Sequence, residues 1–64
     1  MPLVQIDIIK RRDPEQKRAL IRLVTDAVCE ATGAGPEGVW VIVREGSPDD
    51  FGAGGLSATD RGIT

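Results

Sequence analysis

A long amphipathic stretch between two short apolar runs is the feature that most constrains the fold of this chain. Asp13 is a good N-cap residue, Pro14 suits the first helical position, and Gln16 lies where a capping box needs it. Gly33 is a natural residue to end the helix, because it adopts the left-handed conformation without strain. The pattern therefore predicts one helix over residues 14–32.

Apolar residues recur along this helix at three- and four-residue steps, which predicts a buried stripe on one side. The expected members of the stripe are Ala19, Leu20, Leu23, Val24, Ala27, Val28 and Ala31. The residues expected on the exposed side are Glu15, Arg18, Arg22, Asp26 and Glu30. Cys29 lies beside the stripe, and we expect it to be packed or partly exposed. It is a poor candidate nucleophile, because the chain has no histidine to activate it.

The apolar runs on either side of the helix are predicted to be strands. Residues 2–9 are apolar on both alternating faces apart from Gln5 and Asp7, which is typical of a strand buried on both faces in a parallel sheet. A second strand is predicted from about residue 39 to residue 45. Two strands joined by a helix form a β-α-β unit, which we expect to be parallel and right-handed. The glycine-rich tail, residues 46–64, predicts turns with a small hairpin near residues 51–56.

The chain is too short to stabilise this fold well by itself. At 64 residues it is one domain at most, and apolar burial at this size roughly equals the conformational entropy lost on folding. One cysteine excludes an internal disulfide, and one cysteine with no histidine argues against a structural zinc site. A two-stranded sheet also has free edges, and one helix covers only one of its faces. We therefore predict a single α+β domain over residues 1–64, a β-α-β protomer with a short C-terminal hairpin, assembled into an obligate oligomer.

Composition argues against several classes of function. A net charge of −2, one tryptophan, one phenylalanine and no tyrosine predict that nucleic acid is not a partner. No apolar run reaches the length of a membrane span, and the N-terminal residues do not resemble a signal peptide, so no membrane partner is expected. A lone thiol suits a reducing compartment, and a cytoplasmic location is predicted.

Two apparent motifs do not predict sites. Residues 33–38 fit G-x-G-x-x-G, but they follow a helix and lead into a strand, whereas a dinucleotide site follows a strand and opens a helix. Pro36 also removes a backbone donor from such a loop. Asp49 and Asp50 have no histidine and no further acid at ligand spacing, so we expect solvated turn residues and no metal site.

Pro2 directly follows Met1 and is the strongest candidate for chemistry. Removal of Met1 would leave a free secondary amine, the form in which a proline nitrogen can act as a base. The chain lacks histidine and tyrosine, so few other groups can carry a proton near pH 7. An apolar pocket or a nearby arginine lowers the pKa of such an amine and favours its neutral, basic form. An arginine would also bind a carboxylate through two parallel bonds, and the candidates are Arg11, Arg12 and Arg44.

Nearly the whole chain resembles the tautomerase superfamily, specifically its short 4-oxalocrotonate tautomerase group. The segments that carry the resemblance are Met1-Pro2, Gln5-Ile6, Arg12-x-x-Glu15-Gln16-Lys17, Leu20-Ile21-Arg22, Val39-x-Val41-Ile42-Val43-x-Glu45 and Phe51-Gly52-x-Gly54-Gly55. The resemblance implies a β-α-β protomer assembled as a hexamer of three dimers, and an isomerase that needs no cofactor. It implies Pro2 as general base, Arg12 as the anchor of the substrate carboxylate, commonly from a neighbouring subunit, and Phe51 as an apolar wall.

Trp40 departs from this family pattern, which has a second arginine at the same position. Its indole offers a ring face and one N–H donor but no charge. A dicarboxylate substrate is therefore disfavoured, and a monocarboxylate or an aryl enol acid resembling phenylpyruvate fits better. Trp40 is then expected to be a second pocket wall. Arg44, whose side chain is expected on the same face as Trp40, is a candidate to compensate for the missing charge.

Other segments resemble the α chain of a trans-3-chloroacrylic acid dehalogenase, namely Gln16-Lys17-Arg18-Ala19-Leu20, Glu30-Ala31-Thr32-Gly33 and Arg44-Glu45-Gly46-Ser47. That family uses a glutamate to activate water and a pair of arginines near the first strand. Here Ala53 stands at the glutamate position and Ile9 at the earlier arginine position. These two departures disfavour dehalogenation or hydration. The leading hypothesis is therefore a keto–enol tautomerase, the alternative is a non-catalytic or α-type subunit of a hetero-oligomer, and a dehalogenase-like hydratase is a third.

Overall fold

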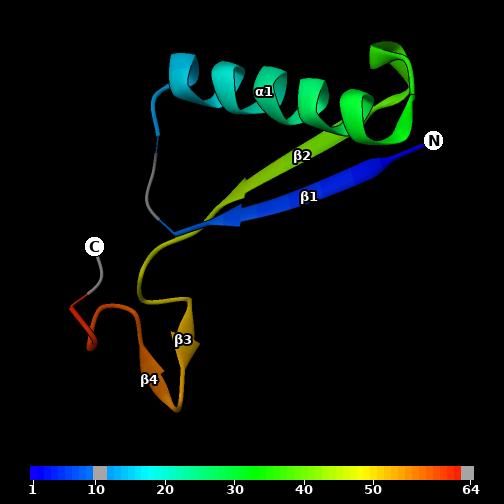
Figure 1. Cartoon of the computed structure of the whole chain (residues 1–64). Coiled ribbons are helices and arrows are strands. Elements are labelled where there is room, and N and C mark those ends of the chain that lie inside the picture. The colour runs from blue at the N-terminus through cyan, green and yellow to red at the C-terminus, as the bar shows by residue number, and fades with distance from the viewer. Residues whose placement is uncertain (10–11, 63–64) are drawn as a thin grey trace.

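The fold is a β-α-β unit followed by a small hairpin, as predicted (Figure 1). The computed structural model describes residues 1–9 and 12–62, so the candidate anchor Arg11 lies outside the described residues. The elements are β1 (Leu3–Ile8), α1 (Pro14–Thr32), a short 3₁₀ helix η1 (Pro36–Gly38), β2 (Trp40–Glu45), β3 (Gly52–Ala53) and β4 (Leu56–Ser57). The predicted bounds of α1 are confirmed, and the two long strands agree with their predicted ranges to within a residue at each described end.

Local chemistry determines where α1 begins and ends. The backbone N–H of Gln16 donates to Asp13 Oδ1 at 2.8 Å, and the backbone N–H of Asp13 donates to Gln16 Oε1 at 3.1 Å. This capping box satisfies two backbone donors that the helix itself leaves without partners. At the other end Gly33 has φ of 79° and donates its N–H to the carbonyl of Cys29 at 2.9 Å. The helix therefore stops where a left-handed residue becomes available.

β1 and β2 pair in parallel, with Leu3 opposite Trp40 at one end and Ile8 opposite Glu45 at the other. β3 and β4 form a separate antiparallel pair in which Gly52 lies opposite Ser57. Their connection, Gly54–Gly55, has positive φ at both residues, as a tight two-residue hairpin turn requires. The predicted C-terminal hairpin is therefore confirmed, and it projects from the carboxyl end of the β1–β2 sheet (Figure 1).

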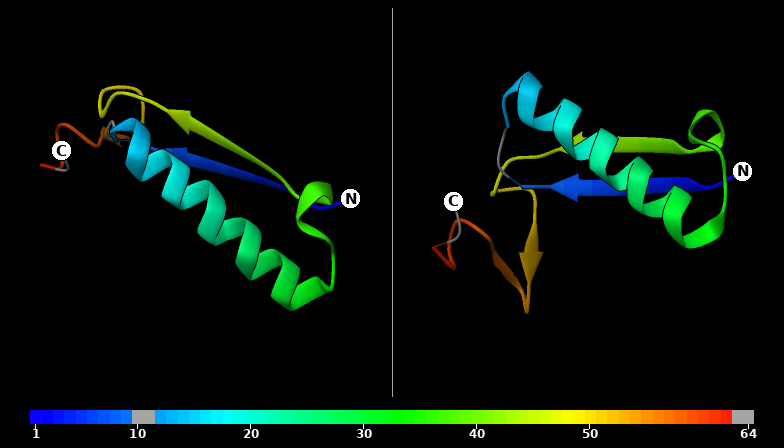
Figure 2. Two further views of the ribbon diagram at one scale, coloured as in Figure 1. Left: turned by 90° about the horizontal axis from the view of Figure 1, so that it is seen from above. Right: turned by 45° about the horizontal axis from the view of Figure 1, so that its top comes forward.

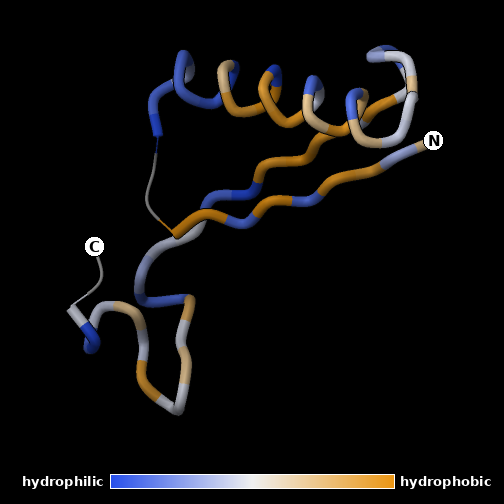
Figure 3. Tube along the Cα trace, viewed as in Figure 1, coloured by the Kyte–Doolittle hydropathy of each residue, from blue (hydrophilic) through white to orange (hydrophobic). Residues whose placement is uncertain are grey.

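α1 covers one face of the β1–β2 sheet and packs mainly against β2 (Figure 2). The apolar residues that meet in this layer are all half-buried; they are Val4, Ile6, Ile8, Leu20, Val24, Val28, Val41 and Val43. Figure 3 shows the two strands and the side of the helix facing them as the most hydrophobic parts of the chain. The apolar contact between helix and sheet is thus the centre of the protomer.

Two expectations about burial are wrong for the single chain. β1 is not buried on both faces, because the face opposite α1 is uncovered and leaves Leu3 58%, Trp40 58% and Ile42 41% exposed. The predicted helix stripe is also too wide. Leu23 is 59% exposed, and Ala27 and Ala31 are exposed as well. The helix instead meets the sheet along a narrower ridge that includes the half-buried Leu20, Val24 and Val28.

The protomer has very little interior of its own. Ala58, at 4% relative exposure, is the one buried residue among those the structure describes. The radius of gyration is 14.5 Å, against about 10.7 Å for a compact domain of this length. The chain is flat, 42 × 25 × 13 Å. A flat protomer with an uncovered apolar sheet face supports the prediction that the chain is stabilised by assembly. No helix within the described residues is both long and apolar enough to cross a membrane.

Candidate active site

Pro2 lies immediately before β1, at the end of the sheet where both long strands begin. Its carbonyl accepts the backbone N–H of Trp40 at 3.0 Å, and Leu3 then pairs with Trp40 in the sheet. The structure therefore brings Pro2 and Trp40, two of the predicted site residues, to the same end of the sheet. Trp40 is largely exposed on the uncovered face, so its indole is available to a ligand or to a second chain.

Arg12 lies at the opposite end of the sheet, where both long strands finish. Its backbone N–H donates to Glu45 Oε2 at 2.9 Å, and Glu45 is the last residue of β2. The other oxygen of the same carboxylate, Oε1, pairs with Lys17 Nζ at 2.9 Å. One carboxylate thus connects the end of β2 to the segment before α1 and to the first turns of the helix. The main chain of Arg12 is positioned by this bridge.

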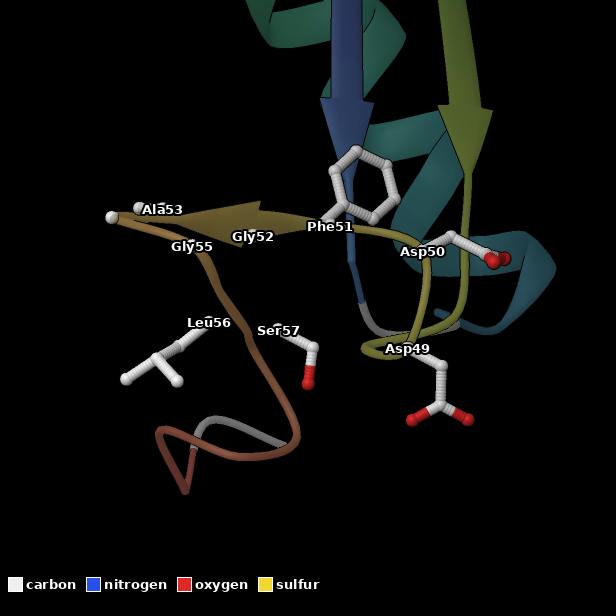
Figure 4. Close-up of a pocket in the computed structure, with 9 residues that line it drawn as sticks. Asp49, Asp50, Phe51, Gly52, Ala53, Gly55, Leu56 and Ser57 are labelled. Carbon is white, nitrogen blue, oxygen red and sulfur yellow. The ribbon is translucent and has the colours of Figure 1, made fainter.

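Phe51 belongs to the same end of the sheet as Arg12. Its half-buried ring lies directly against Gly46, where any added Cβ would overlap it. The backbone N–H of Gly46 donates a hydrogen bond to the carbonyl of Ile8, at the end of β1, at 2.9 Å. The carbonyl of Phe51 accepts the N–H of Ala58 at 2.7 Å, which ties it to the hairpin. Figure 4 shows the ring directed toward β1, away from the hollow beside the hairpin.

The predicted site residues therefore fall into two groups at opposite ends of one strand. β1 contains six residues, which at about 3.3 Å each span roughly 20 Å. Pro2 and Trp40 lie at one end, and Arg12 and Phe51 lie at the other (Figure 1). A small substrate cannot contact both groups within one chain. A site that contains all four residues must combine the Pro2 end of one chain with the Phe51 end of another.

Arg44 is not placed to replace the charge that is missing at Trp40. It lies four residues further along β2, about 13 Å away. Its Nε and Nη2 donate to the two carboxylate oxygens of Asp7 at 2.9 and 3.2 Å, across the strand pair. Both side chains are about half exposed, so the pair adds little stability, but it engages the guanidinium. The structure thus does not support a compensating role for Arg44.

Asp49 and Asp50 are turn residues, as expected. Both are exposed, and Asp49 Oδ1 accepts the hydroxyl of Thr59 at 2.6 Å. The backbone N–H of Asp49 donates to the hydroxyl of Ser47 at 3.2 Å. Their carboxylates lie apart from each other at the edge of a hollow that also includes the hairpin (Figure 4). Within residues 1–9 and 12–62, no cluster of three or more cysteine, aspartate or glutamate side chains is arranged to hold a metal ion.

Glu45 makes a contribution that the sequence did not predict. Its side chain is only 22% exposed, and both oxygens have partners. The sequence does contain a signal for this contact. Glu45 ends the second parallel strand, and the residues that follow the first strand, 10–12, are all basic. Parallel pairing alone therefore placed a carboxylate next to the segment that contains Arg12.

Substitution of Glu45 by glutamine is expected to lower the free energy of unfolding by about 1 kcal/mol, because a charge-assisted bond and an ion pair become neutral contacts. Urea unfolding at a fixed protein concentration measures this change. Lys17→Met is the matched control, since it removes the ion pair and leaves the acceptor of the Arg12 N–H in place. Amide exchange at Arg12 should accelerate in Glu45→Gln more than in Lys17→Met. Equal exchange in the two variants would contradict the positioning of Arg12 by Glu45.

Comparison with known proteins identifies relatives along almost the whole chain. A family model described as Tautomerase enzyme matches residues 2–61. A probable tautomerase of Halalkalibacterium halodurans is 39% identical over 61 residues, which cover 95% of this chain and all of that protein.

Solved structures agree with the sequence comparisons. TomN, a 4-oxalocrotonate tautomerase homologue in the tomaymycin biosynthetic pathway, is 33% identical with a TM-score of 0.90, covering 98% of this chain and 97% of TomN. A heterohexamer 4-oxalocrotonate tautomerase from Chloroflexus aurantiacus is 30% identical with a TM-score of 0.86, covering 94% of this chain and 97% of that one. The fold and nearly all of its length are therefore shared with these proteins.

Proposed function

This chain belongs to the tautomerase family, and from that premise we propose that it is a cofactor-independent keto–enol tautomerase acting on a small carboxylated enol or keto acid. Pro2 is the general base after Met1 is removed, Arg12 binds the substrate carboxylate, and Phe51 and Trp40 are the pocket walls. The observation that carries the proposal is the family match, which begins at Pro2 itself. Met1 is 91% exposed, which supports its accessibility to an aminopeptidase.

The proposed chemistry needs one base and one anion-binding group. The neutral amine of Pro2 removes the proton of the enol hydroxyl and becomes an ammonium group. The same group then returns that proton to carbon, so the reaction consumes no proton overall. The Arg12 guanidinium binds the carboxylate through two parallel bonds and fixes the distance between the amine and the reacting atoms. Apolar walls exclude water and favour the neutral amine.

We propose that each site is shared between two chains of a homo-oligomer, a hexamer of three dimers. The roughly 20 Å between the Pro2 and Phe51 ends of one chain supports a shared site. The uncovered face with Leu3, Trp40 and Ile42 supports an assembly that buries it. The relative from Chloroflexus aurantiacus is a heterohexamer, which is consistent with six subunits of this size.

A second candidate function is that of a subunit in a hetero-oligomer, either non-catalytic or of the α type. The observation that favours it is the heterohexameric relative, because a heterohexamer contains more than one kind of chain. In that case the purified chain would be inactive alone and active with its partner. A dehalogenase-like hydratase is a third candidate, and release of halide from a 3-haloacrylate would distinguish it from a tautomerase.

The test of the proposed function is ultraviolet-monitored ketonisation of phenylenolpyruvate and 2-hydroxymuconate by protein that intact mass shows to begin at Pro2. We expect turnover, with kcat/KM at least about tenfold higher for phenylenolpyruvate, because Trp40 offers a ring face but no charge. Trp40→Arg should shift this preference toward the dicarboxylate by about tenfold or more. Trp40→Leu is the control, since it removes the ring without adding a charge. No turnover of either compound would contradict the proposed activity of the chain alone.

A further inference from the structure

We propose that Arg61 forms, with an apolar cavity beside Phe51, a second carboxylate-binding subsite that no position of the β1–β2 sheet provides. The cavity has a volume of about 350 Å³. Its lining residues are Ile9, Phe51, Gly52, Ala53, Ala58 and Arg61. It is therefore an apolar recess with one cationic side chain, located between the carboxyl end of β1 and the hairpin.

The backbone around Arg61 is fixed by a chain of turn hydrogen bonds. Its own N–H donates to the carbonyl of Ser57 at 3.1 Å, and the N–H of Asp60 donates to the Ser57 hydroxyl at 3.1 Å. Gly62 N–H donates to the carbonyl of Thr59 at 3.0 Å. Ala58, which also lines the cavity, is equally constrained, since it is buried and its N–H donates to the carbonyl of Phe51. The subsite is thus built on ordered turns.

The guanidinium of Arg61 has binding capacity to spare. Its one hydrogen bond in the described part of the chain runs from Nη1 to the neutral carbonyl of Ala53, at a long 3.3 Å. No described carboxylate forms an ion pair with it. By contrast, Arg44 forms an ion pair with Asp7 and donates to both of its carboxylate oxygens. A guanidinium presents five donors, so Arg61 retains a fork for a carboxylate.

Charge complementarity identifies the ligand as a carboxylate on an apolar chain. The apolar walls accept the hydrocarbon part, and Arg61 binds the anion at the rim. This role rests on the proposed function, in which Phe51 already belongs to the substrate pocket. Arg61 would then hold the end of an extended acid that lies away from the enol, a task that Trp40 cannot perform. The substrate class then includes, besides the preferred aryl enol acids, elongated keto or enol acids with a distal carboxylate.

Binding can be tested without turnover. The assembled protein that lacks Met1 is titrated with hexanoate, and its backbone amide resonances are followed by NMR. We expect shifts at Gly52, Ala53 and Ala58, and a Kd about tenfold weaker in Arg61→Met. Arg18→Met, which removes an exposed helix arginine, is the matched control and should leave Kd unchanged. Hexanamide, which has a similar shape without the charge, should bind the native protein about as weakly as hexanoate binds Arg61→Met.

Kinetics supply a second readout. Arg61→Met should raise KM for 2-hydroxymuconate about tenfold with kcat retained, and leave phenylenolpyruvate unaffected. An equal Kd for hexanoate in native and Arg61→Met protein would overturn the subsite. Absence of hexanoate shifts, with Arg61→Met weakening subunit association, would also overturn it and assign the cavity to a second copy of the chain. Binding that depends on Arg61 in a protein without turnover would retain the subsite and refute the proposed function.

Discussion

Replacement of Pro2 by alanine is expected to lower kcat/KM by about 10²- to 10⁴-fold, the range in which positioned proton transfer contributes to catalysis. Alanine keeps a terminal amine, but it is a primary amine on a less constrained residue. The loss should appear in kcat with KM little changed, because Pro2 transfers the proton, whereas Arg12 binds the substrate carboxylate. The measurement is steady-state ketonisation of phenylenolpyruvate, with intact mass to establish the first residue of each preparation.

A preparation that retains Met1 provides the matched control for this experiment. In that form the Pro2 nitrogen belongs to a tertiary amide and has no basic lone pair, while every other side chain is unchanged. We expect the retained-Met1 protein to be at least as inactive as Pro2→Ala. Circular dichroism and sedimentation should show the same fold and assembly in all three proteins. Full activity in protein that keeps Met1 would remove Pro2 from the reaction.

Helix bounds were predictable because the signals that determine them are local. Asp13 and Gln16 satisfy each other's backbone donors, and Gly33 supplies the left-handed residue that ends α1. These interactions involve residues three or four apart, so they depend little on the rest of the molecule. The parallel pairing of β1 and β2 followed from the same reasoning, because a helix between two strands brings the second strand back in the same direction.

Burial was harder to predict because it depends on how elements pack. Leu23 fits the apolar period of α1, yet it is exposed, since the axis of the helix over β2 places Leu20 and Val24 inward. Leu3 and Trp40 belong to an apolar sheet face that a single helix cannot cover. Burial of this face depends on how chains assemble, and local sequence patterns do not encode that arrangement. Arg61 was not predictable for the same reason, because the fold of the hairpin brings it to the cavity beside Phe51.

The division of the candidate site was implicit in the sequence. Pro2 precedes the first strand and Arg12 follows it, so any extended strand between them separates the two residues. The resemblance to the family placed both residues in one site, and the two statements are compatible only when a neighbouring chain contributes. The structure adds Trp40 to the Pro2 end and Phe51 to the Arg12 end. In a shared site, one chain would therefore contribute Pro2 with Trp40, and the other would contribute Arg12 with Phe51.

Two variants that are inactive separately are expected to restore activity when they are mixed. Pro2→Ala retains an intact Arg12 and Phe51 end, and Arg12→Gln retains an intact Pro2 and Trp40 end. In a randomly assembled one-to-one mixture, about one site in four receives both intact ends. We therefore expect co-refolded protein to recover roughly a quarter of the native kcat/KM per site, well above either variant alone. Ketonisation of phenylenolpyruvate measures the recovery.

Restoration distinguishes a shared site from a site within one chain, because a one-chain site would contain one defect in every copy whatever its neighbours are. Mixing without refolding should give little recovery until the subunits exchange. Co-refolding of Pro2→Ala with Pro2→Ala that also carries Trp40→Leu is the negative control, since neither chain contributes an intact base. If Pro2→Ala and Arg12→Gln each remain inactive in mixed oligomers shown by mass to contain both chains, the two ends do not meet. Pro2 and Arg12, roughly 20 Å apart along β1, would then not belong to one shared site.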